Sequence, residues 1–347
     1  MRIINVGNFE YKNRFQSFFN TARKLSHGLI RLGHSVYDFS DRDVSRQFGL
    51  FNSRKLGVRS ANACLLDACR NVEPDLVLLG HADVIQPDTL AAIRKALPAV
   101  RIAQWNYDAL YLADNIRRLE SKIDVVDITF VSTAGPAPAR LSRPGGRVAY
   151  LPNPVDSSME DGRSFEVADH EHDLFFGMRS GRNWRRWGDE PLTGDALAKR
   201  LRAAFPDFRL CLPGLEERPP VYGMAYLNSI RNSLMGLSLS QESNQPLYAS
   251  DRMAHLTGMG TLTLIDRSTG FDRIYAEDEA AFYSSVDELI EKARHFKNHP
   301  DEARLVAERG WRRTHAVFDS RRVARYLIEQ TFGMPFTEGY EWPVEAL

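Results

Sequence analysis

Short apolar runs alternate with amphipathic segments throughout the first half of the chain. Residues 87–96 have the spacing of a helix, and Phe15, Phe18, Ala22, Leu25 and Leu29 recur every three or four residues, which also predicts a helix. Strands are expected at residues 2–6, 35–39, 75–80, 101–105 and 125–132, with another beginning at residue 149. Wholly apolar runs of this kind are typical of parallel strands covered on both faces. The pattern predicts an α/β domain.

The same alternation begins again near residue 172, after a polar, acidic stretch that follows Pro152 and Pro154. Strands are expected at residues 172–177, 208–212, 235–240 and 261–265, and helices at 195–205, 226–233 and 251–258. Three more helices should begin near Ser285, Pro300 and Ser320. The predicted division is a first domain at 1–156, a linker at 157–172, a second domain at 173–330, and a tail at 331–347 that packs back toward the first domain.

Composition narrows the classes of function. The 347 residues suggest about two domains at ~150 residues each. Lys+Arg and Asp+Glu both number 45, and such a balance disfavours a dedicated nucleic-acid binder. The three cysteines, none in a Cys-x-x-Cys pair, disfavour a disulfide scaffold or a cysteine zinc site. With no long apolar run and no signal-peptide pattern, we expect a cytoplasmic protein.

Several polar side chains directly follow predicted strands of the first half. Ligands of open α/β sheets bind beyond the carboxyl ends of the strands, so these residues should lie near one rim. Asp108, His81 and Asp83 are the candidates for a general base, and a structural role is the alternative for each. The rim is completed by Gly7, Asn8 and Asn106, which we assign to the acceptor side.

Motifs of several other enzyme classes are missing from the sequence. No Gly-x-Gly-x-x-Gly follows the first strand of either half, which disfavours a nicotinamide dinucleotide site. There is also no P-loop, no Gly-x-Ser-x-Gly elbow and no His-Glu-x-x-His helix. The nine histidines show no convincing metal-ligand spacing, so no metal and no cofactor are expected.

A set of strings in the second half resembles one enzyme family. Tyr222-Gly223-Met224-Ala225-Tyr226, the segment Arg252–Gly260 and the tail Ala307–Trp311, together with the Leu-Pro-Asn-Pro-Val-Asp string at 151–156, are similar to group 1 glycosyltransferases of the GT-B type. More narrowly, they resemble the spore-maturation-protein-like branch. The resemblance implies two Rossmann-like domains facing across a cleft. It also implies a nucleotide-sugar donor, as a substrate rather than a cofactor, and a saccharide or lipid-linked glycan acceptor.

The resemblance also implies where the donor binds. Arg252 begins a predicted helix, and a guanidinium beside a helix N-terminus suits a diphosphate. A surface arginine paired with an acid is the alternative. The other donor-binding candidates are Gly177, Arg179, Arg182, Gly214, Tyr222, Gly223, Gln241 and His255. Asp108 lies in a Trp-Asn-Tyr-Asp string similar to a Trp-x-x-Asp pattern of the family.

Two positions depart from the family pattern. His255 occupies a position where the family usually has glutamate, and Leu247, eight residues earlier, replaces a second glutamate. The pair that holds donor hydroxyls in the family is therefore missing. This departure motivates one alternative to a transferase, a catalytically weak GT-B scaffold that binds a sugar nucleotide or a partner. A sugar-nucleotide epimerase on the same fold is a further alternative.

The aromatic stripe near the N-terminus has two interpretations. We expect Phe15, Phe18, Leu25 and Leu29 to form part of the core. The alternative is that this face, flanked by Lys12, Arg14, Arg23 and Lys24, rests on an anionic membrane. On that hypothesis the protein is peripheral at the inner face of the membrane, where an acceptor for cell-envelope polysaccharide would be found.

Overall fold

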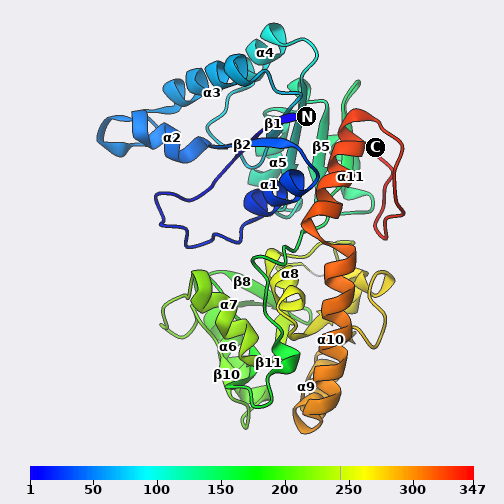
Figure 1. Cartoon of the computed structure of the whole chain (residues 1–347). Helices are drawn as coiled ribbons and strands as arrows, with labels where there is room; N and C mark the ends of the chain where they lie inside the picture. The colour runs from blue at the N-terminus through cyan, green and yellow to red at the C-terminus, as the bar shows by residue number, and fades with distance from the viewer. Residues whose placement is uncertain (243) are drawn as a thin grey trace. The chain divides into compact units, whose positions relative to one another are not determined.

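The computed structural model describes residues 1–242 and 244–347, which form two compact units. Unit 1 consists of Met1–Pro154 and Asp319–Leu347, and unit 2 consists of Val155–Phe318. Each unit is a parallel sheet with helices on its faces (Figure 1). We therefore describe each unit by itself.

Unit 1 has a six-stranded parallel sheet in the order β2-β1-β3-β4-β5-β6. Its strands are β1 (Arg2–Gly7), β2 (Ser35–Ser40), β3 (Leu76–Leu79), β4 (Arg101–Asn106), β5 (Ile128–Val131) and β6 (Arg147–Tyr150). Its helices are α1 (Thr21–Arg31), α2 (Asp41–Phe48), α3 (Val58–Val72), α4 (Pro87–Ala96), α5 (Ala113–Glu120) and α11 (Ser320–Phe332). The strand order reverses between β1 and β3, the point at which open sheets of this kind bind ligands.

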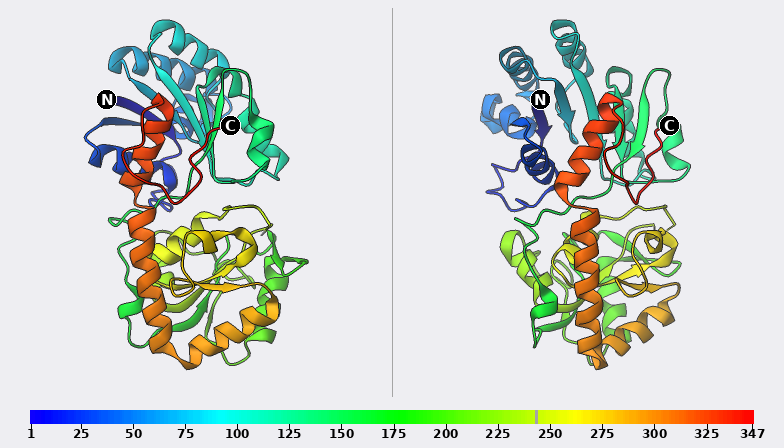
Figure 2. Two further views of the ribbon diagram at one scale, coloured as in Figure 1. Left: turned by 90° about the vertical axis from the view of Figure 1, so that its right-hand side faces the viewer. Right: turned by 45° about the vertical axis from the view of Figure 1, so that its right-hand side comes forward.

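The last helix of the chain belongs to unit 1. Helix α11 packs against α1, and Figure 2 shows the two side by side in both views. The contact is so close at Gly28 that a Cβ there would lie 2.1 Å from the carbonyl oxygen of Ser320. Any larger residue at position 28 would force the two helices apart.

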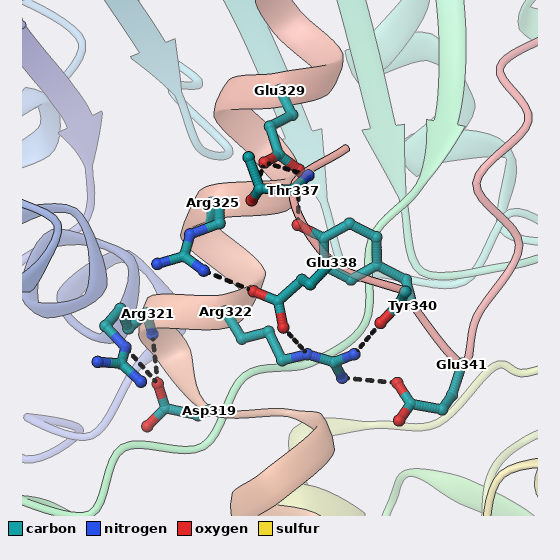
Figure 3. A network of polar contacts seen from close by, with 10 residues as sticks. Asp319, Arg321, Arg322, Arg325, Glu329, Thr337, Glu338, Tyr340 and Glu341 are labelled. Carbon is teal, nitrogen blue, oxygen red and sulfur yellow. Dashed lines mark hydrogen bonds and ion pairs between the residues drawn. The ribbon is translucent and has the colours of Figure 1, made fainter. Parts of the chain in front are cut away.

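The C-terminal tail is held to α11 by a polar network (Figure 3). The guanidinium of Arg322 donates to Glu338 at 2.7 Å and to Glu341 at 2.6 Å, and Tyr340 donates from its hydroxyl to Glu329 at 2.7 Å. Leu347 then exchanges both backbone hydrogen bonds with Val148 of β6, at 2.8 and 2.9 Å. The tail therefore covers an edge of the unit 1 sheet.

Unit 2 has a five-stranded parallel sheet in the order β10-β7-β11-β12-β13. Its strands are β7 (His172–Phe175), β10 (Leu210–Cys211), β11 (Ser233–Ser238), β12 (Leu262–Asp266) and β13 (Ala281–Tyr283); β8 (Trp184–Trp187) and β9 (Glu190–Thr193) form a separate antiparallel pair. Its helices are α6 (Gly194–Ala204), α7 (Gly223–Arg231), α8 (Asp251–Gly258), α9 (Val286–Asn298) and α10 (Pro300–Val317). Here the strand order reverses between β7 and β11.

The predicted elements are largely confirmed. The helices over residues 87–96 and 251–258 have the predicted bounds, and Ser285 caps α9 by accepting from the backbone N–H of Glu288. The prediction of one helix from Phe15 to Leu29 is wrong in its first part. Residues 11–19 form turns, α1 begins at Thr21 behind the N-cap Asn20, and Phe15 is 46% exposed. Leu25 and Leu29 are buried as predicted.

The contacts divide the chain at other positions than the predicted boundaries. The segment 157–172, predicted as a linker, belongs to unit 2, and α11, predicted in the second domain, belongs to unit 1. Helix α11 begins at Ser320 as predicted, and its N-cap is Asp319. Helix periodicity identifies an apolar face but does not say which sheet that face will cover. The tail at 331–347, predicted to pack toward the first domain, lies in unit 1 together with α11.

Candidate functional site

The switch point of unit 2 lies where β7 and β11 end. Gly177 closely follows β7 and Leu239 directly follows β11, and the side chain of Arg252 reaches both. Its guanidinium donates to the carbonyl oxygen of Leu239 at 2.8 Å and to that of Gly177 at 3.1 Å. The first turn of α8 thus delivers a cation to the place where this sheet type binds ligands.

The charge of Arg252 has no acidic partner among the described residues. The residue is 9% exposed, its guanidinium carbon lies 4.7 Å from the ring centre of Phe176, and both of its hydrogen bonds go to neutral carbonyls. Burial, and to a smaller extent the charge of Arg185, lower the pKa of Arg252 to about 10. A buried cation without a carboxylate is costly to the fold, so this site favours an anionic ligand.

Two of the glycines predicted to bind the donor, Gly177 and Gly214, allow close packing of the segments near Arg252. A Cβ at Gly214 would lie 1.7 Å from the carbonyl oxygen of Met178, and Gly214 has a φ of +79°. A Cβ at Gly177 would lie 2.9 Å from the ring of Phe175 and 3.1 Å from Pro213. Both glycines therefore shape the ends of β7 and β10 through their backbone.

The remaining predicted donor residues lie on segments around the ends of these strands. Arg179 and Arg182 are exposed in the loop after β7, and the described residues offer neither an acidic partner. Gln241 is partly buried just beyond β11. Tyr222 is exposed as the N-cap of α7, and Gly223 begins that helix with a φ of +57°. The side chains of Arg179, Arg182 and Tyr222 are therefore exposed, and that of Gln241 is partly exposed.

His255 lies buried on α8, one turn after Arg252. Its Nδ1 is 3.3 Å from the hydroxyl of Tyr226, and its Nε2 is 3.7 Å from a carboxylate oxygen of Glu160. Glu160, also fully buried, accepts from the backbone N–H of Asp156 at 2.9 Å. The position where the family has a glutamate is therefore occupied by a histidine that faces another glutamate from within unit 2.

The hydroxyl of Ser250, the N-cap of α8, was not singled out from the sequence. Its oxygen is buried and has no hydrogen-bond partner among the described residues. It lies two residues before Arg252 and at the helix end that carries partial positive charge. Serine at an N-cap normally accepts a hydrogen bond from the helix backbone, but the Ser250 hydroxyl does not. The sequence could not show this, because it depends on the side-chain geometry in the fold.

The structure brings the three base candidates of unit 1 together around Arg118. Its Nη1 donates to Asp108 Oδ2 at 3.0 Å and lies 3.3 Å from His81 Nδ1, and its Nε lies 3.5 Å from Asp83 Oδ1. His81 Nε2 lies 3.4 Å from the same Asp108 oxygen. Both ring nitrogens of His81 are therefore engaged. Asp108 Oδ1 has no partner among the described residues, and the side chain is 45% exposed.

The charges of this rim are largely balanced. Asp83 pairs with Arg42, and Arg54 lies 3.7 Å from it. Burial by itself raises the pKa of Asp83, but Arg42 and Arg118 outweigh it and leave the pKa below its usual value. Burial lowers the pKa of His81, and Asp108 opposes this effect, so His81 stays neutral at pH 7.

Two further titratable groups near this rim were missed from the sequence. Asp41 begins α2 and is fully buried, and its burial raises its pKa to about 6. Lys122 is also buried, which lowers its pKa, while the charges of Asp83 and Asp41 raise it. Neither residue has a motif, because their burial depends on how distant segments fold over them.

The predicted acceptor-side residues have different roles. Asn106 is buried, accepts at Oδ1 from the backbone N–H of Asp108 at 2.8 Å, and has an amide nitrogen with no partner among the described residues. Gly7 ends β1, and a Cβ there would lie 3.0 Å from that of Ala22. Asn8 is bonded within its own loop, to Glu10. Asn106 therefore orients Asp108, whereas Gly7 and Asn8 shape the turn after β1.

One exposed group in the described part of the chain has a metal-ligand composition. It consists of His295, His299 and Glu302, at the turn from α9 to α10. The group lies away from the strand ends that carry the two rims, so it has no place in either candidate site.

Comparison with known proteins bears on the fold of the chain. Residues 179–329 match a family profile described as glycosyl transferase-like. A search of curated proteins finds no significant match. Sucrose-phosphate synthase from Thermosynechococcus elongatus is similar over 96% of this chain and 99% of its own, with a TM-score of 0.58 and 11% identity. The chain has the GT-B fold.

Two more solved structures are similar over nearly the whole chain. AviGT4, a glycosyltransferase involved in avilamycin A biosynthesis, is 15% identical with a TM-score of 0.56, over 95% of this chain and 96% of its own. HepE from Anabaena, in complex with UDP, is 11% identical with a TM-score of 0.51, over 96% of this chain and 100% of its own. The profile match covers residues 179–329, and the whole-chain likeness to these structures shows the fold.

Proposed function

We propose that this GT-B protein is a glycosyltransferase that moves a sugar from a nucleotide-sugar donor to a hydroxyl of a saccharide or glycoconjugate. Unit 2 binds the donor, and unit 1 binds the acceptor. The observation that carries the proposal is the buried guanidinium of Arg252 at the switch point of unit 2, which has no carboxylate partner among the described residues. The HepE structure with UDP supports a nucleotide-sugar donor. The spore-maturation-protein-like branch stays a prediction.

The donor side stabilises the leaving group. When the bond between the anomeric carbon and the phosphate oxygen breaks, the electron pair stays on the nucleoside diphosphate. Arg252 and the positive end of α8 stabilise that charge, and the hydroxyl of Ser250 is available to donate to it. Positive charge from the chain itself removes the need for a metal ion, so we propose a metal-independent reaction.

The acceptor side supplies a base if the anomeric configuration is inverted. Asp108 Oδ1 takes the proton of the acceptor hydroxyl, whose oxygen then attacks the anomeric carbon. The other carboxylate oxygen stays fixed by Arg118 and His81. If the configuration is retained, no such base is needed.

Nucleotide binding followed by donor turnover tests the proposal. We expect one nucleoside diphosphate, in a panel of five bases, to raise the melting temperature by mass action. Arg252→Ala should reduce that shift, whereas Arg200→Ala, which removes an exposed arginine of α6, should keep it. If no nucleotide shifts the folded wild-type protein, unit 2 is not a donor site.

Donor turnover separates the proposed transferase from the two alternatives. A transferase releases some nucleoside diphosphate from its donor without an acceptor, and more with one. A binding scaffold releases none, and an epimerase converts the donor sugar without an acceptor, which NMR of the sugar protons detects. The experiment includes the binding scaffold because His255 replaces a glutamate of the family pattern, and the epimerase because it is a further alternative on the same fold.

A further inference from the structure

Two neighbouring segments of unit 1 expose large apolar side chains. Tyr11 and Phe15 lie in the first segment, residues 11–16, and both are about half exposed. The second segment, residues 47–59, exposes Phe48, Leu50, Phe51 and Leu56, of which Phe51 is 97% exposed and Leu50 71%. Soluble proteins normally bury or scatter such groups, and a cluster of them marks a contact surface.

Helix α2 joins the two segments. Asp43, in its first turn, accepts from the backbone N–H groups of Tyr11 and Lys12 at 3.1 and 3.3 Å. The last two residues of α2, Gln47 and Phe48, begin the second segment. Figure 1 shows α2 and the turn-rich N-terminal loop together in unit 1.

All charged residues of these segments are basic. The sequence has no Asp or Glu at 11–16 or 47–59, although the whole chain has as many acids as bases. Arg54 lies 3.7 Å from Asp83. The others have no ion pair among the described residues and are exposed: Lys12, Arg14, Lys55 and Arg59.

Backbone hydrogen bonds hold the tips in place. Phe51 and Asn52 have φ values of +57° and +55°, and the backbone N–H groups of Asn52 and Ser53 donate to the carbonyls of Gly49 and Leu50. On either side of the first segment, the backbone N–H of Ser17 donates to the carboxylate of Glu10. The exposed side chains are therefore presented by formed turns rather than by loose chain.

We propose that residues 11–16 and 47–59 dock unit 1 onto an anionic lipid bilayer, with Leu50 and Phe51 inserted among the headgroups. Exposed apolar side chains insert at the boundary between headgroups and acyl chains, and nearby lysines and arginines are attracted to anionic lipids. None of the helices in the described part of the chain has the length and apolar character needed to cross a bilayer. The proposed docking surface consists of the two segments alone, and turns replace the predicted helical stripe that included Phe15 and Phe18.

Vesicle flotation of the full chain without donor or acceptor tests this proposal. We expect binding to vesicles of phosphatidylcholine with 30% phosphatidylglycerol, and weak binding to phosphatidylcholine alone. Raising the salt from 0.1 to 1 M should release most of the protein, because the charge attraction is screened. The assay is independent of the glycosyltransferase proposal, since vesicle binding and nucleotide binding are measured separately.

Two variants separate the apolar and the charged contributions. Leu50→Ser with Phe51→Ser should weaken vesicle binding at least tenfold, and Lys55→Glu with Arg59→Glu should weaken it by a similar factor and remove most of its salt dependence. Leu305→Ser and Lys199→Glu, which change exposed residues of α10 and α6 in unit 2, should bind as the wild type does. All six positions are exposed, so unchanged melting temperatures are expected.

Three results would overturn the proposal. The first is no binding of the wild type to anionic vesicles, and the second is equal binding by wild type and both patch variants. The third is a wild-type dimer that the Leu50→Ser, Phe51→Ser variant converts to monomer in analytical ultracentrifugation. That result would assign the surface to a second copy of the chain.

Discussion

The carboxyl ends of the two sheets carry opposite kinds of charge arrangement. In unit 2, Arg252 is buried and bonded only to neutral carbonyls. In unit 1, Arg118 and Arg42 are bonded to Asp108 and Asp83, which also face His81. An uncompensated buried cation costs the free protein stability that an anionic ligand returns, whereas a balanced network holds side chains in position. The strand ends of unit 2 therefore suit the binding of an anion, and those of unit 1 hold the carboxylates and His81 in fixed positions.

The largest effect is expected from Asp108→Asn, which keeps the shape of the unit 1 network and removes its basicity. Turnover should fall by about 10²–10⁴, the contribution of general base catalysis, with nucleotide affinity unchanged. Steady-state kinetics with the identified donor and acceptor measure it. His81→Ala and Asp83→Asn are the matched variants.

These variants also show where the assignment would move. Near-normal turnover in Asp108→Asn together with loss in His81→Ala would make His81 the base. If none of the three variants matters, the reaction retains configuration without a base or the acceptor binds elsewhere.

The second prediction concerns the protonation of Asp41, and so the balance of charge at the unit 1 rim. Asp41 has a pKa of about 6 in the fold, against an ordinary value of 3.8, because it is buried. Between these values the folded state holds the proton and the unfolded state does not, so the contribution of this carboxyl to stability falls by about 3 kcal/mol as pH rises. Urea denaturation at pH 4, 5, 6 and 7 measures this loss.

Asp41→Asn should remove the loss, whereas Asp88→Asn, at an exposed position of α4, should keep it. If the Asp41→Asn protein loses stability with pH in parallel with the wild type, the carboxyl is ionised in the fold. The balance of the unit 1 rim would then have to include it.

The third prediction removes the uncompensated cation of unit 2. Arg252→Ala should weaken nucleoside diphosphate binding by about 1.5–3 kcal/mol, or roughly ten- to a hundredfold, because a charge-assisted hydrogen bond is lost. Arg252→Lys should restore only part, since the planar fork is missing. Calorimetric titration measures the affinity, and Arg118→Gln is the control on the other unit. Unchanged affinity in folded Arg252→Ala would remove this residue from the donor site.

The smallest effect is expected at Ser250. Its hydroxyl has no partner among the described residues, so Ser250→Ala should leave the melting temperature of the free protein within about 1 °C. Nucleotide affinity should fall by about 0.5–1.5 kcal/mol if the hydroxyl donates to the ligand. A loss of stability with no loss of affinity would show that the hydroxyl serves the fold instead.

The periodicity of the sequence by itself determined the two βα halves, the parallel strands and the helices over 87–96 and 251–258, because apolar spacing reflects burial along one element. It also placed Asp108, His81 and Asp83 after strand ends, and strand ends of one parallel sheet share an edge. Only the tertiary structure decided that α11 packs with unit 1, that Arg118 joins the three candidates, and that Asp41 and Lys122 are buried beside them. It likewise decided that Phe15 is exposed on a turn. These features depend on contacts between distant segments, which no local pattern of residue types records.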